Sequence, residues 1–363
     1  MKIFTLIPKA SATEIAVFEN DEAIFSKTIA HVPSEFAALR TPPEQGQYRF
    51  NAIIEAVTAS DFDMKDVGVV ITEIASRRLP AGIYMIDDSI TAILAENMID
   101  ENQHRSGVFA ALLVSRHIGG NHDVECMPLV VEPIIISEIM PEAAISGLKG
   151  ITREPVCNTL SHRTAASHYS HYEKGSGLND ARVVAVHLGN EISVGAYDMG
   201  RLLDSNSPQD GEGPFSPFTS GTLPANSLID LCYSGRYDMD ETLRIISSES
   251  GLSAYLDDAS LPAVMKAYRA GHRKTIFMVK AMAYKTAREI GAKAAALSGS
   301  VEAILLTGPW AVFEEFTREI SSRVEWIAPV RNYALEGEMK QLARAAAEVY
   351  KGNVKIKLYG LDC

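Results

Sequence analysis

The pattern of apolar and polar positions near the N-terminus predicts a β-hairpin unit. Residues 3–28 contain two apolar, β-rich runs on either side of a polar loop at 7–13. A third run follows a turn at Glu19-Asn20-Asp21. Short apolar runs separated by turn residues are typical of paired strands. We therefore expect strand, loop, strand, turn and strand in this order.

The same pattern returns half a chain later. Residues 183–204 again contain two strand-like runs around a loop at 188–192, and a third run follows the turn Asp198-Met199-Gly200. Phe4 corresponds to Val184, an offset of 180 residues in a chain of 363. A repeat at this offset indicates two copies of one unit. Two unrelated hairpins would also look alike, so the hairpins alone leave that alternative open.

Each half continues with a mixed pattern of strands and helices. Strand-like runs at 67–71 and 302–307 alternate with long helical stretches at 264–297 and 336–350. This pattern predicts an α/β fold class with two domains, which we place at residues 1–165 and 166–363. Two such domains around a central cleft would direct the loops at 7–13 and 188–192 into it.

These loops suit phosphate binding to different degrees. A tight turn of small residues lets backbone N–H groups approach phosphate oxygens, and Gly189 meets this need in the second loop. The first loop, Pro8-Lys9-Ala10-Ser11-Ala12, contains no glycine and is less suited.

Composition excludes several classes of function. The net charge is −12 and no basic run occurs, so nucleic acid is an unexpected partner. No apolar run approaches the roughly 18 residues of a membrane helix, and no signal peptide is evident. The four cysteines lack C-x-x-C spacing, which favours a reducing cytoplasm and argues against a zinc site. We expect no metal held by the protein itself.

A longer motif resembles the butyrate kinases of the acetokinase family. Residues 187–224 are similar to the phosphate-binding hairpin and following loop of these enzymes, and the most specific part is the run DGEGPFSP at 210–217. Further similarity is found at 7–8, 103–104, 130–133, 229–236, 280–291, 302–308, 327–330 and 338–339. The resemblance therefore spans nearly the whole chain.

The resemblance implies a fold and a reaction. The fold would be two duplicated ribonuclease-H-like domains of the actin-like type around a central cleft, in a homodimer or larger homo-oligomer. The C-terminal helix around 336–350 would pack back on the first domain. The reaction would transfer a phosphoryl group reversibly between Mg-ATP and a short-chain carboxylic acid, giving an acyl phosphate.

Many residues that this reaction needs are replaced. The family's opening N-P-G-S-T-S-T-K motif is aligned with Ile7 to Glu14, and only Ser11 and Thr13 offer hydroxyls. The arginine of a G-R-G-G turn is aligned with Thr72, and a second arginine with Thr219. Asn158 is aligned with a histidine of the family. The adenosine-side T-G-G motif becomes Thr307-Gly308-Pro309-Trp310, in which we expect Trp310 to add bulk.

The remaining candidates form three groups. Catalytic candidates are Glu132 at the family's catalytic aspartate position, His104, and the pair Arg77 and Arg78, which could replace the missing arginine or be a solvated loop pair. Phosphate-loop candidates are Ser11, Thr13, His187, Gly189, Asn190 and Ser193. Other cleft candidates are Asp210, Glu212, Thr219, Asn158, Gly308 and Glu338.

Two substitutions add negative charge where phosphates would lie. Glu14 replaces the lysine of the first motif, and Glu191 stands in the second loop. A carboxylate about 4 Å from a phosphate oxygen costs about 4 kcal/mol at an effective dielectric of 20. Glu14 could instead point to solvent by strand alternation. We expect His162, His168 and His171 to line a solvated helix face.

Three functional hypotheses follow. The first is a butyrate kinase-like protein that is weak or inactive as a kinase because its phosphate-binding and catalytic motifs are eroded. The second is a functional carboxylate kinase with rearranged site residues, and the third is a non-catalytic binding or assembly subunit. ATP and Mg²⁺ are implied by the resemblance alone, and their binding is doubtful on the substitutions above.

Overall fold

The computed structural model describes residues 1–9, 11–60, 62–74, 82–95, 102–122, 125–131, 139–177, 180–334 and 337–358. The chain forms two compact units. The first contains Met1–Ile135 together with Glu338–Cys363, and the second contains Ile136–Gly337. The division thus falls earlier than residue 165, because helix α6 (Thr159–His168) packs on strands of the second unit.

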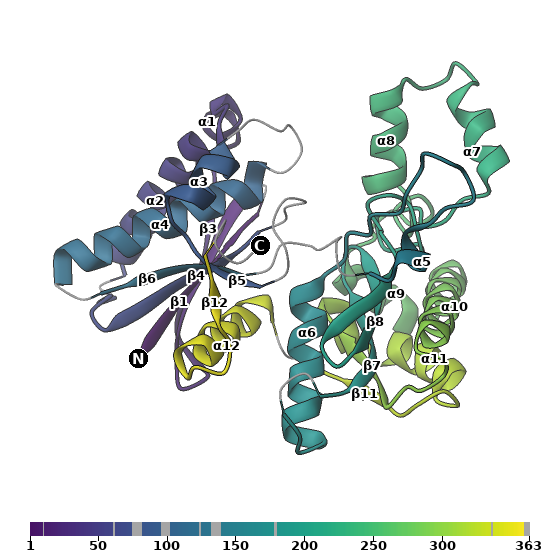
Figure 1. Ribbon diagram of the computed structural model, residues 1–363. Coiled ribbons are helices and arrows are strands. Elements are labelled where there is room, and N and C mark those ends of the chain that lie inside the picture. The colour runs from purple at the N-terminus through teal and green to yellow at the C-terminus, as the bar shows by residue number, and fades with distance from the viewer. Residues whose placement is uncertain are drawn as a thin grey trace. The chain divides into compact units, whose positions relative to one another are not determined.

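The first unit is built on a seven-stranded sheet in the order β12-β5-β6-β4-β1-β2-β3. Its strands are β1 (Lys2–Pro8), β2 (Ala12–Glu19), β3 (Glu22–Ala30), β4 (Val67–Glu73), β5 (Ile83–Met85), β6 (Met127–Val131) and β12 (Ile356–Lys357). Its helices are α1 (Pro33–Ala38), α2 (Pro42–Thr58), α3 (Asp88–Ala95), α4 (Asn102–His122) and α12 (Glu338–Tyr350). Helices α2 and α4 cover one face and α12 the other (Figure 1).

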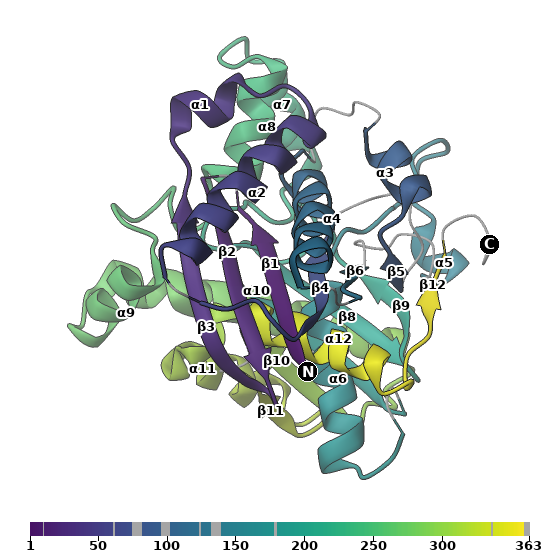
Figure 2. The same ribbon diagram turned by 90° about the vertical axis from the view of Figure 1, so that its left-hand side faces the viewer.

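Side-chain alternation in β1 explains this layering. Phe4 and Leu6 lie in the core under α2 and α4 with Val108 and Val114 of α4. Thr5 points the opposite way, because its hydroxyl contacts Met339 of α12. Successive side chains of a strand alternate between faces, so an apolar strand with a helix on each side is buried throughout. Figure 2 shows α2 and α4 crossing this sheet side by side.

The second unit is built on a five-stranded sheet in the order β11-β10-β7-β8-β9. Its strands are β7 (Arg182–Leu188), β8 (Ile192–Asp198), β9 (Arg201–Ser205), β10 (Ala303–Thr307) and β11 (Val330–Asn332). Its helices are α5 (Pro141–Ala144), α6, η1 (Tyr169–Glu173), α7 (Ala225–Cys232), α8 (Met239–Ser248), α9 (Leu261–Arg269), α10 (Arg273–Ala296), η2 (Pro309–Val312) and α11 (Glu314–Val324). Helix α10 covers one face and α6 the other (Figure 1).

The internal duplication is confirmed by the two sheets. The strands β6-β4-β1-β2-β3 and β11-β10-β7-β8-β9 have the same order and the same parallel and antiparallel pairings. Even the register shift recurs, at Val17/Phe18 in one hairpin and Ala196/Tyr197 in the other. The mixed α/β class is confirmed with it.

The predicted turns explain why the hairpins form. Asn20 and Asp21 have φ of 50° and 69°, and Met199 and Gly200 have φ of 51° and 80°. Two consecutive residues with positive φ match the right-handed twist of the flanking strands. Asparagine, aspartate and glycine tolerate this conformation best, which is why the turns could be located from the sequence.

The predicted helix over 264–297 is two helices. Helix α9 ends at Arg269 and α10 begins at Arg273. Gly271 between them has a φ of +80°, and His272 caps α10 by accepting a hydrogen bond from the Thr275 backbone N–H. A glycine in this conformation ends one helix and frees the chain to start the next.

Helix α12 is held to the first unit by ions as well as by packing. Asp21, in the first hairpin turn, accepts two hydrogen bonds of 2.9 Å from Arg344 and lies 3.2 Å from Lys340. The bond from Arg344 lowers the pKa of Asp21 more than burial raises it.

Within the described residues, no helix is both long and apolar enough to cross a membrane.

We predict that Asp21→Asn loosens α12 without disturbing the turn, because asparagine also tolerates positive φ. Amide exchange over residues 338–350 at neutral pH should rise about two- to five-fold, as expected for a loss of roughly 0.5–1 kcal/mol. Since the folded pKa of Asp21 is depressed, the contribution is present above the ordinary value of 3.8 and is lost as pH falls through the folded value. The difference should therefore vanish in acid, and Glu22→Gln should have no effect at either pH.

Candidate functional site

The first loop leads into a group of charged side chains that we call the first-loop cluster: Lys9, Glu14, Glu73 and Glu338. The Lys9 ammonium donates a hydrogen bond of 2.8 Å to Glu338 at the start of α12. Burial lowers the pKa of Lys9, but Glu338, with smaller effects of Glu73 and Glu14, raises it above its ordinary value. One ammonium therefore faces three carboxylates.

Glu73 is the most perturbed member of the first-loop cluster. It ends β4, the parallel neighbour of β1. Burial and then the Glu338 charge raise its pKa to about 7, while Lys9 acts in the opposite direction. A carboxyl group in this setting is partly protonated at neutral pH. Neither Lys9 nor Glu73 was among the predicted site residues, although Lys9 lies within the Ile7–Glu14 motif and Glu73 directly follows Thr72.

Two threonine hydroxyls of this region are hydrogen-bonded within the protein. Thr72, at the family's arginine position, is fully buried and donates a hydrogen bond of 2.9 Å to the Leu6 carbonyl. Thr13 is also fully buried, and its hydroxyl accepts from Arg49 at 2.8 Å. Of the two hydroxyls predicted for the first phosphate loop, Ser11 and Thr13, only Ser11 is exposed.

The second loop is tightly packed around His187. The His187 ring is hydrogen-bonded to Ser161 at 3.1 Å, and its Nε2 atom lies 2.5 Å from where a Cβ of Gly189 would stand. The glycine is therefore required by packing. Its N–H donates to the Glu191 carbonyl at 3.0 Å, within the loop itself. Burial raises the pKa of Glu191.

Ser193 and Asn158 meet beneath the same loop. The fully buried Ser193 hydroxyl accepts from the Asn158 backbone N–H at 3.2 Å and lies 3.2 Å from His162. His162 is also fully buried, and burial, followed by the His187 charge, lowers its pKa to about 3. The prediction of a solvated helix face is thus wrong for His162, which is a neutral core residue. The His168 ring lies against Tyr333 at a tilted angle, with ring centroids 4.9 Å apart.

Thr219 closes a turn that holds the second loop in place. Its buried hydroxyl lies 2.7 Å from that of Ser216, and its N–H donates to the same oxygen at 2.9 Å. Ser216 in turn donates to the Asn190 carbonyl at 2.6 Å. The Asn190 side chain is exposed. The side chain of Thr219, which is aligned with the family's second arginine, is therefore hydrogen-bonded inside the protein.

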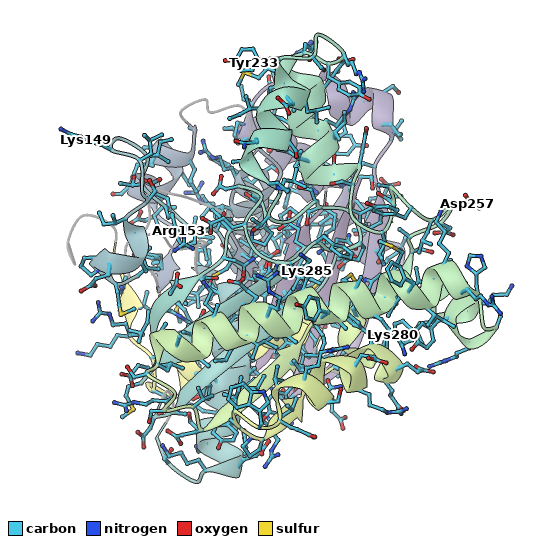
Figure 3. All side chains as sticks on the ribbon, turned by 90° about the vertical axis from the view of Figure 1, so that its right-hand side faces the viewer. Lys149, Arg153, Tyr233, Asp257, Lys280 and Lys285 are labelled. Atoms are coloured by element: carbon cyan, nitrogen blue, oxygen red, sulfur yellow. The ribbon has the colours of Figure 1, made fainter. Side chains whose placement is uncertain are left out.

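The acids of the DGEGPFSP run are engaged in the same way. Glu212 accepts two hydrogen bonds from Arg153, at 2.7 and 2.8 Å, and Asp210 accepts one of 2.6 Å from Ser207. Arg153 also donates to Asp204, which pairs with Lys293 at 2.7 Å. The bonds to Glu212 raise the pKa of Arg153. Arg153 is labelled in Figure 3.

The adenosine-side motif is arranged differently from our expectation. Gly308 has a φ of +87°, and a Cβ there would lie 2.6 Å from the Leu188 carbonyl oxygen at the end of β7. Trp310 is only 3% exposed and packs with Phe313 and Phe316 in the core. The expectation that Trp310 adds bulk to this site is wrong, because η2 turns its ring inward.

The remaining candidates are not brought together by the described structure. Arg77, Arg78 and Glu132 lie outside the described residues. His104 lies on α4, and its side chain is not described. Their proposed roles stay predictions.

Comparison with known proteins identifies the family. The acetokinase family matches residues 157–325. Butyrate kinase 2 of Clostridium acetobutylicum is 30% identical over 359 residues, covering 99% of both chains. A probable butyrate kinase of Bacteroides thetaiotaomicron is 30% identical over 359 residues, covering 99% of this chain and 100% of its own.

Solved structures show the same fold. Acetate kinase of Porphyromonas gingivalis has a TM-score of 0.73 at 13% identity, and that of Entamoeba histolytica has 0.74 at 11%. Both comparisons cover 96% of this chain and 99% of the other. These folds consist of two duplicated actin-like domains. The chain therefore belongs to the acetokinase family, as a member of the butyrate kinase type.

Proposed function

We propose that this carboxylate kinase homologue has strongly reduced phosphotransferase activity. The observation that carries the proposal is the first-loop cluster, in which the Lys9 ammonium is bound to Glu338 while Glu14 and the partly protonated Glu73 add two more acidic groups. An ammonium neutralised by its own chain has little charge to offer a phosphoryl group.

Phosphoryl transfer makes a demand that these residues meet poorly. The transferring group carries charge on three oxygens, and cationic donors stabilise it in the transition state. An arginine in that role is commonly worth about 10³ to 10⁵ in rate. Thr72 and Thr219 stand at the two arginine positions, and both side chains are hydrogen-bonded within the protein.

The fit to the family's cofactors is also poor. Kinases of this family use ATP and Mg²⁺. A carboxylate near a phosphate oxygen opposes binding by about 4 kcal/mol at 4 Å and an effective dielectric of 20. Glu14 in the first unit and Glu191 in the second both add such a charge. We therefore assign no chemical step to bound Mg-ATP.

The intact DGEGPFSP run does not by itself favour an active kinase. Glu212 is bound by Arg153 and Ser216 by the second loop, so folding alone is a reason to retain them. An active enzyme would need cations from residues such as Arg77 and Arg78, with a short-chain carboxylate or acyl phosphate as substrate.

We propose a cytoplasmic location, which the free Cys126, Cys157 and Cys232 support.

We further propose a homodimer formed by the α7–α8 arm, residues 225–248. Helix α7 has no buried residue, and the arm and its flanks expose six large hydrophobic side chains: Leu223, Ile229, Tyr233, Tyr237, Met239 and Leu243. Figure 3 shows Tyr233 at the outer end of the arm. Exposed apolar groups of this size usually mark an interface.

Charge supports a second copy as the partner. The arm carries exposed side chains of both signs, including Arg236 and Asp240, so a two-fold pairing can match opposite charges. The exposed charges of α10 are all positive, as Lys280 and Lys285 illustrate in Figure 3, and self-pairing there would oppose like charges. We therefore assign the interface to the arm.

The first prediction of this proposal concerns catalysis. Turnover with Mg-ATP and acetate, propionate or butyrate should stay near background in a coupled assay, with Butyrate kinase 2 of Clostridium acetobutylicum as positive control. A turnover near the ~10 s⁻¹ typical of enzymes would overturn the proposal. In that case Arg77→Ala with Arg78→Ala would test whether these arginines supply the missing charge.

The second prediction concerns nucleotide binding. A ligand at 100 times its Kd stabilises a protein by about 2.7 kcal/mol, yet millimolar Mg-ATP should hardly shift the melting temperature here. Glu14→Lys with Glu191→Gly should increase the shift by removing repulsion. The control Glu22→Lys with Glu325→Gly makes the same change in net charge at exposed positions. It should leave the shift in melting temperature unchanged. A clear shift in the unmodified protein would count against the proposal.

The third prediction concerns the arm. Light scattering should find a dimer at micromolar concentration, and Tyr233→Glu with Met239→Glu should give a folded monomer. Phe277→Glu, which alters an exposed aromatic side chain of α10, should leave the dimer intact. A monomeric unmodified protein, or a dimer that survives the change in the arm, would exclude this interface.

A further inference from the structure

Helix α10 has an outer face that carries two exposed aromatic side chains. Its inner side packs on the sheet of the second unit through core residues such as Met282 and Ile290. On the outer side, Phe277 is 69% exposed and Tyr284 is 48% exposed. Figure 3 looks onto this side, with α10 toward the viewer. Exposed apolar groups that lie along one face of an element indicate a binding surface.

The outer positions follow the repeat of a helix that pairs with another helix. Lys274, Phe277, Ala281, Tyr284 and Arg288 are spaced three, four, three and four residues apart. Because an α-helix has 3.6 residues per turn, these positions form one line along it. Alternating spacings of three and four residues make the seam of a coiled coil, in which the side chains of two helices interdigitate. Helix α10 therefore has an unpaired seam of about two heptads.

The charges of this face have one sign. Arg273 and Lys280 lie seven residues apart along one border of the seam, and Lys285 lies along the other. Together with Lys274 and Arg288 of the seam itself, they are five exposed cations. In coiled coils, charged residues that border the seam select the partner by pairing with opposite charges.

Few acids within the protein neutralise these cations. Glu289, the single acid of α10, pairs at 3.1 Å with Lys293, whose side chain is buried. Of the five exposed cations, Lys280 alone has an ion-pair partner among the described residues, Glu319 of α11 at 3.2 Å. Four cations thus stay without a partner acid on a chain whose net charge is −12. The face is complementary to an acidic partner.

Helix α11 fixes aromatic groups at the edge of this face. The Arg323 guanidinium lies over the Tyr284 ring, 5.6 Å from its centroid. The Trp326 indole N–H donates a hydrogen bond of 2.9 Å to the Arg323 carbonyl, although the Trp326 side chain is 80% exposed. Tyrosine, tryptophan and arginine carry most of the energy at protein interfaces, and holding them in place before binding lowers the entropic cost.

We propose that the outer face of α10, from Arg273 to Arg288, is a docking surface for an acidic amphipathic helix of another protein. Apolar side chains of that helix enter the seam beside Phe277 and Tyr284, and its bordering carboxylates pair with cations such as Lys285. A second copy of α10 does not meet this requirement, because cations would then face cations.

An anionic membrane also fits this face less well than a helix does. A flat surface laid on α10 would approach the exposed acids of the adjacent α11, Glu314 and Glu325. The net charge of −12 would oppose its approach as well. A helix is only about 10 Å wide, so it contacts α10 without reaching these acids.

A synthetic peptide tests the seam and its charge together. The probe is a fluorescein-labelled, stapled helix of about 18 residues with leucine at the seam positions and glutamate on both borders. It should bind the whole protein at least about tenfold more tightly than the same peptide with lysine in place of glutamate, because like charges across an interface are strongly unfavourable. No saturable binding, or equal binding of both peptides, would overturn the proposal.

Charge reversal on α10 locates the binding. Lys285→Glu with Arg288→Glu should weaken binding of the glutamate peptide about tenfold or more at low salt, and most of this difference should disappear at about 0.5 M NaCl. The matched control, Lys65→Glu with Lys149→Glu, reverses two exposed charges outside α10 and should leave the Kd within about twofold. An equal loss in the control, or no loss in the α10 variant, would contradict the proposed surface.

Removal of the aromatic rings separates the seam from the charge. Phe277→Ala with Tyr284→Ala should weaken peptide binding about tenfold at low salt and at about 0.5 M NaCl alike, since screening leaves apolar contacts intact. Tyr255→Ala with Tyr350→Ala is the control at exposed aromatic positions elsewhere and should have no effect. Unchanged binding without the two rings would show attraction by charge alone and would exclude a helix in the seam.

Two further measurements examine the other occupants. Vesicles of phosphatidylcholine and phosphatidylglycerol should not sediment the protein, and light scattering should give the same molecular mass with and without Lys285→Glu and Arg288→Glu. Sedimentation that this variant abolishes would assign the face to a membrane. A change in molecular mass would assign it to a second copy of the chain. Either result would overturn the proposal.

Discussion

The Arg153–Glu212 ion pair is the interaction around which the second unit is organised. All five N–H groups of Arg153 have acceptors: two oxygens of Glu212, one of Asp204, and the carbonyls of Ala143 and Ser205. One side chain therefore joins the segment before α6, the end of β9 and the loop after it. Because a planar guanidinium bound on every side leaves little freedom to its partners, it fixes the DGEGPFSP loop against the sheet.

The buried arginine of the first unit, Arg49, has no acid as a partner among the described residues. Arg49 is as buried as any core residue, yet carbonyls, hydroxyls and a neutral histidine surround it instead of acids. Three acids of this unit, Glu14, Glu73 and Glu338, act instead on Lys9. The first loop therefore lies between the Arg49 guanidinium and the acids around Lys9.

The sequence was sufficient for the fold because the relevant signals are local. Asn20, Asp21 and Gly200 mark hairpin turns through their own backbone preferences, and the apolar runs beside them fix the strands. The candidate site depends on contacts that no local pattern contains. Lys9 and Glu338 are 329 residues apart, and Arg49 of helix α2 contacts Thr13 of strand β2. Trp310 and His162 were misjudged for a related reason, since alignment and spacing do not tell whether a side chain turns inward.

The retained DGEGPFSP run and the altered first loop of this chain are under different constraints. The DGEGPFSP run holds the second unit together through Glu212 and Ser216, so its loss would unfold a loop whatever the protein does. The carboxyl groups of the first-loop cluster are not bound in this way: of its acids, Glu338 is hydrogen-bonded to Lys9, and Glu14 and Glu73 act on Lys9 through their charge. A motif that folding requires can be retained for that reason alone. Its presence is therefore weak evidence for catalysis, whereas the charge of the first-loop cluster bears on catalysis directly.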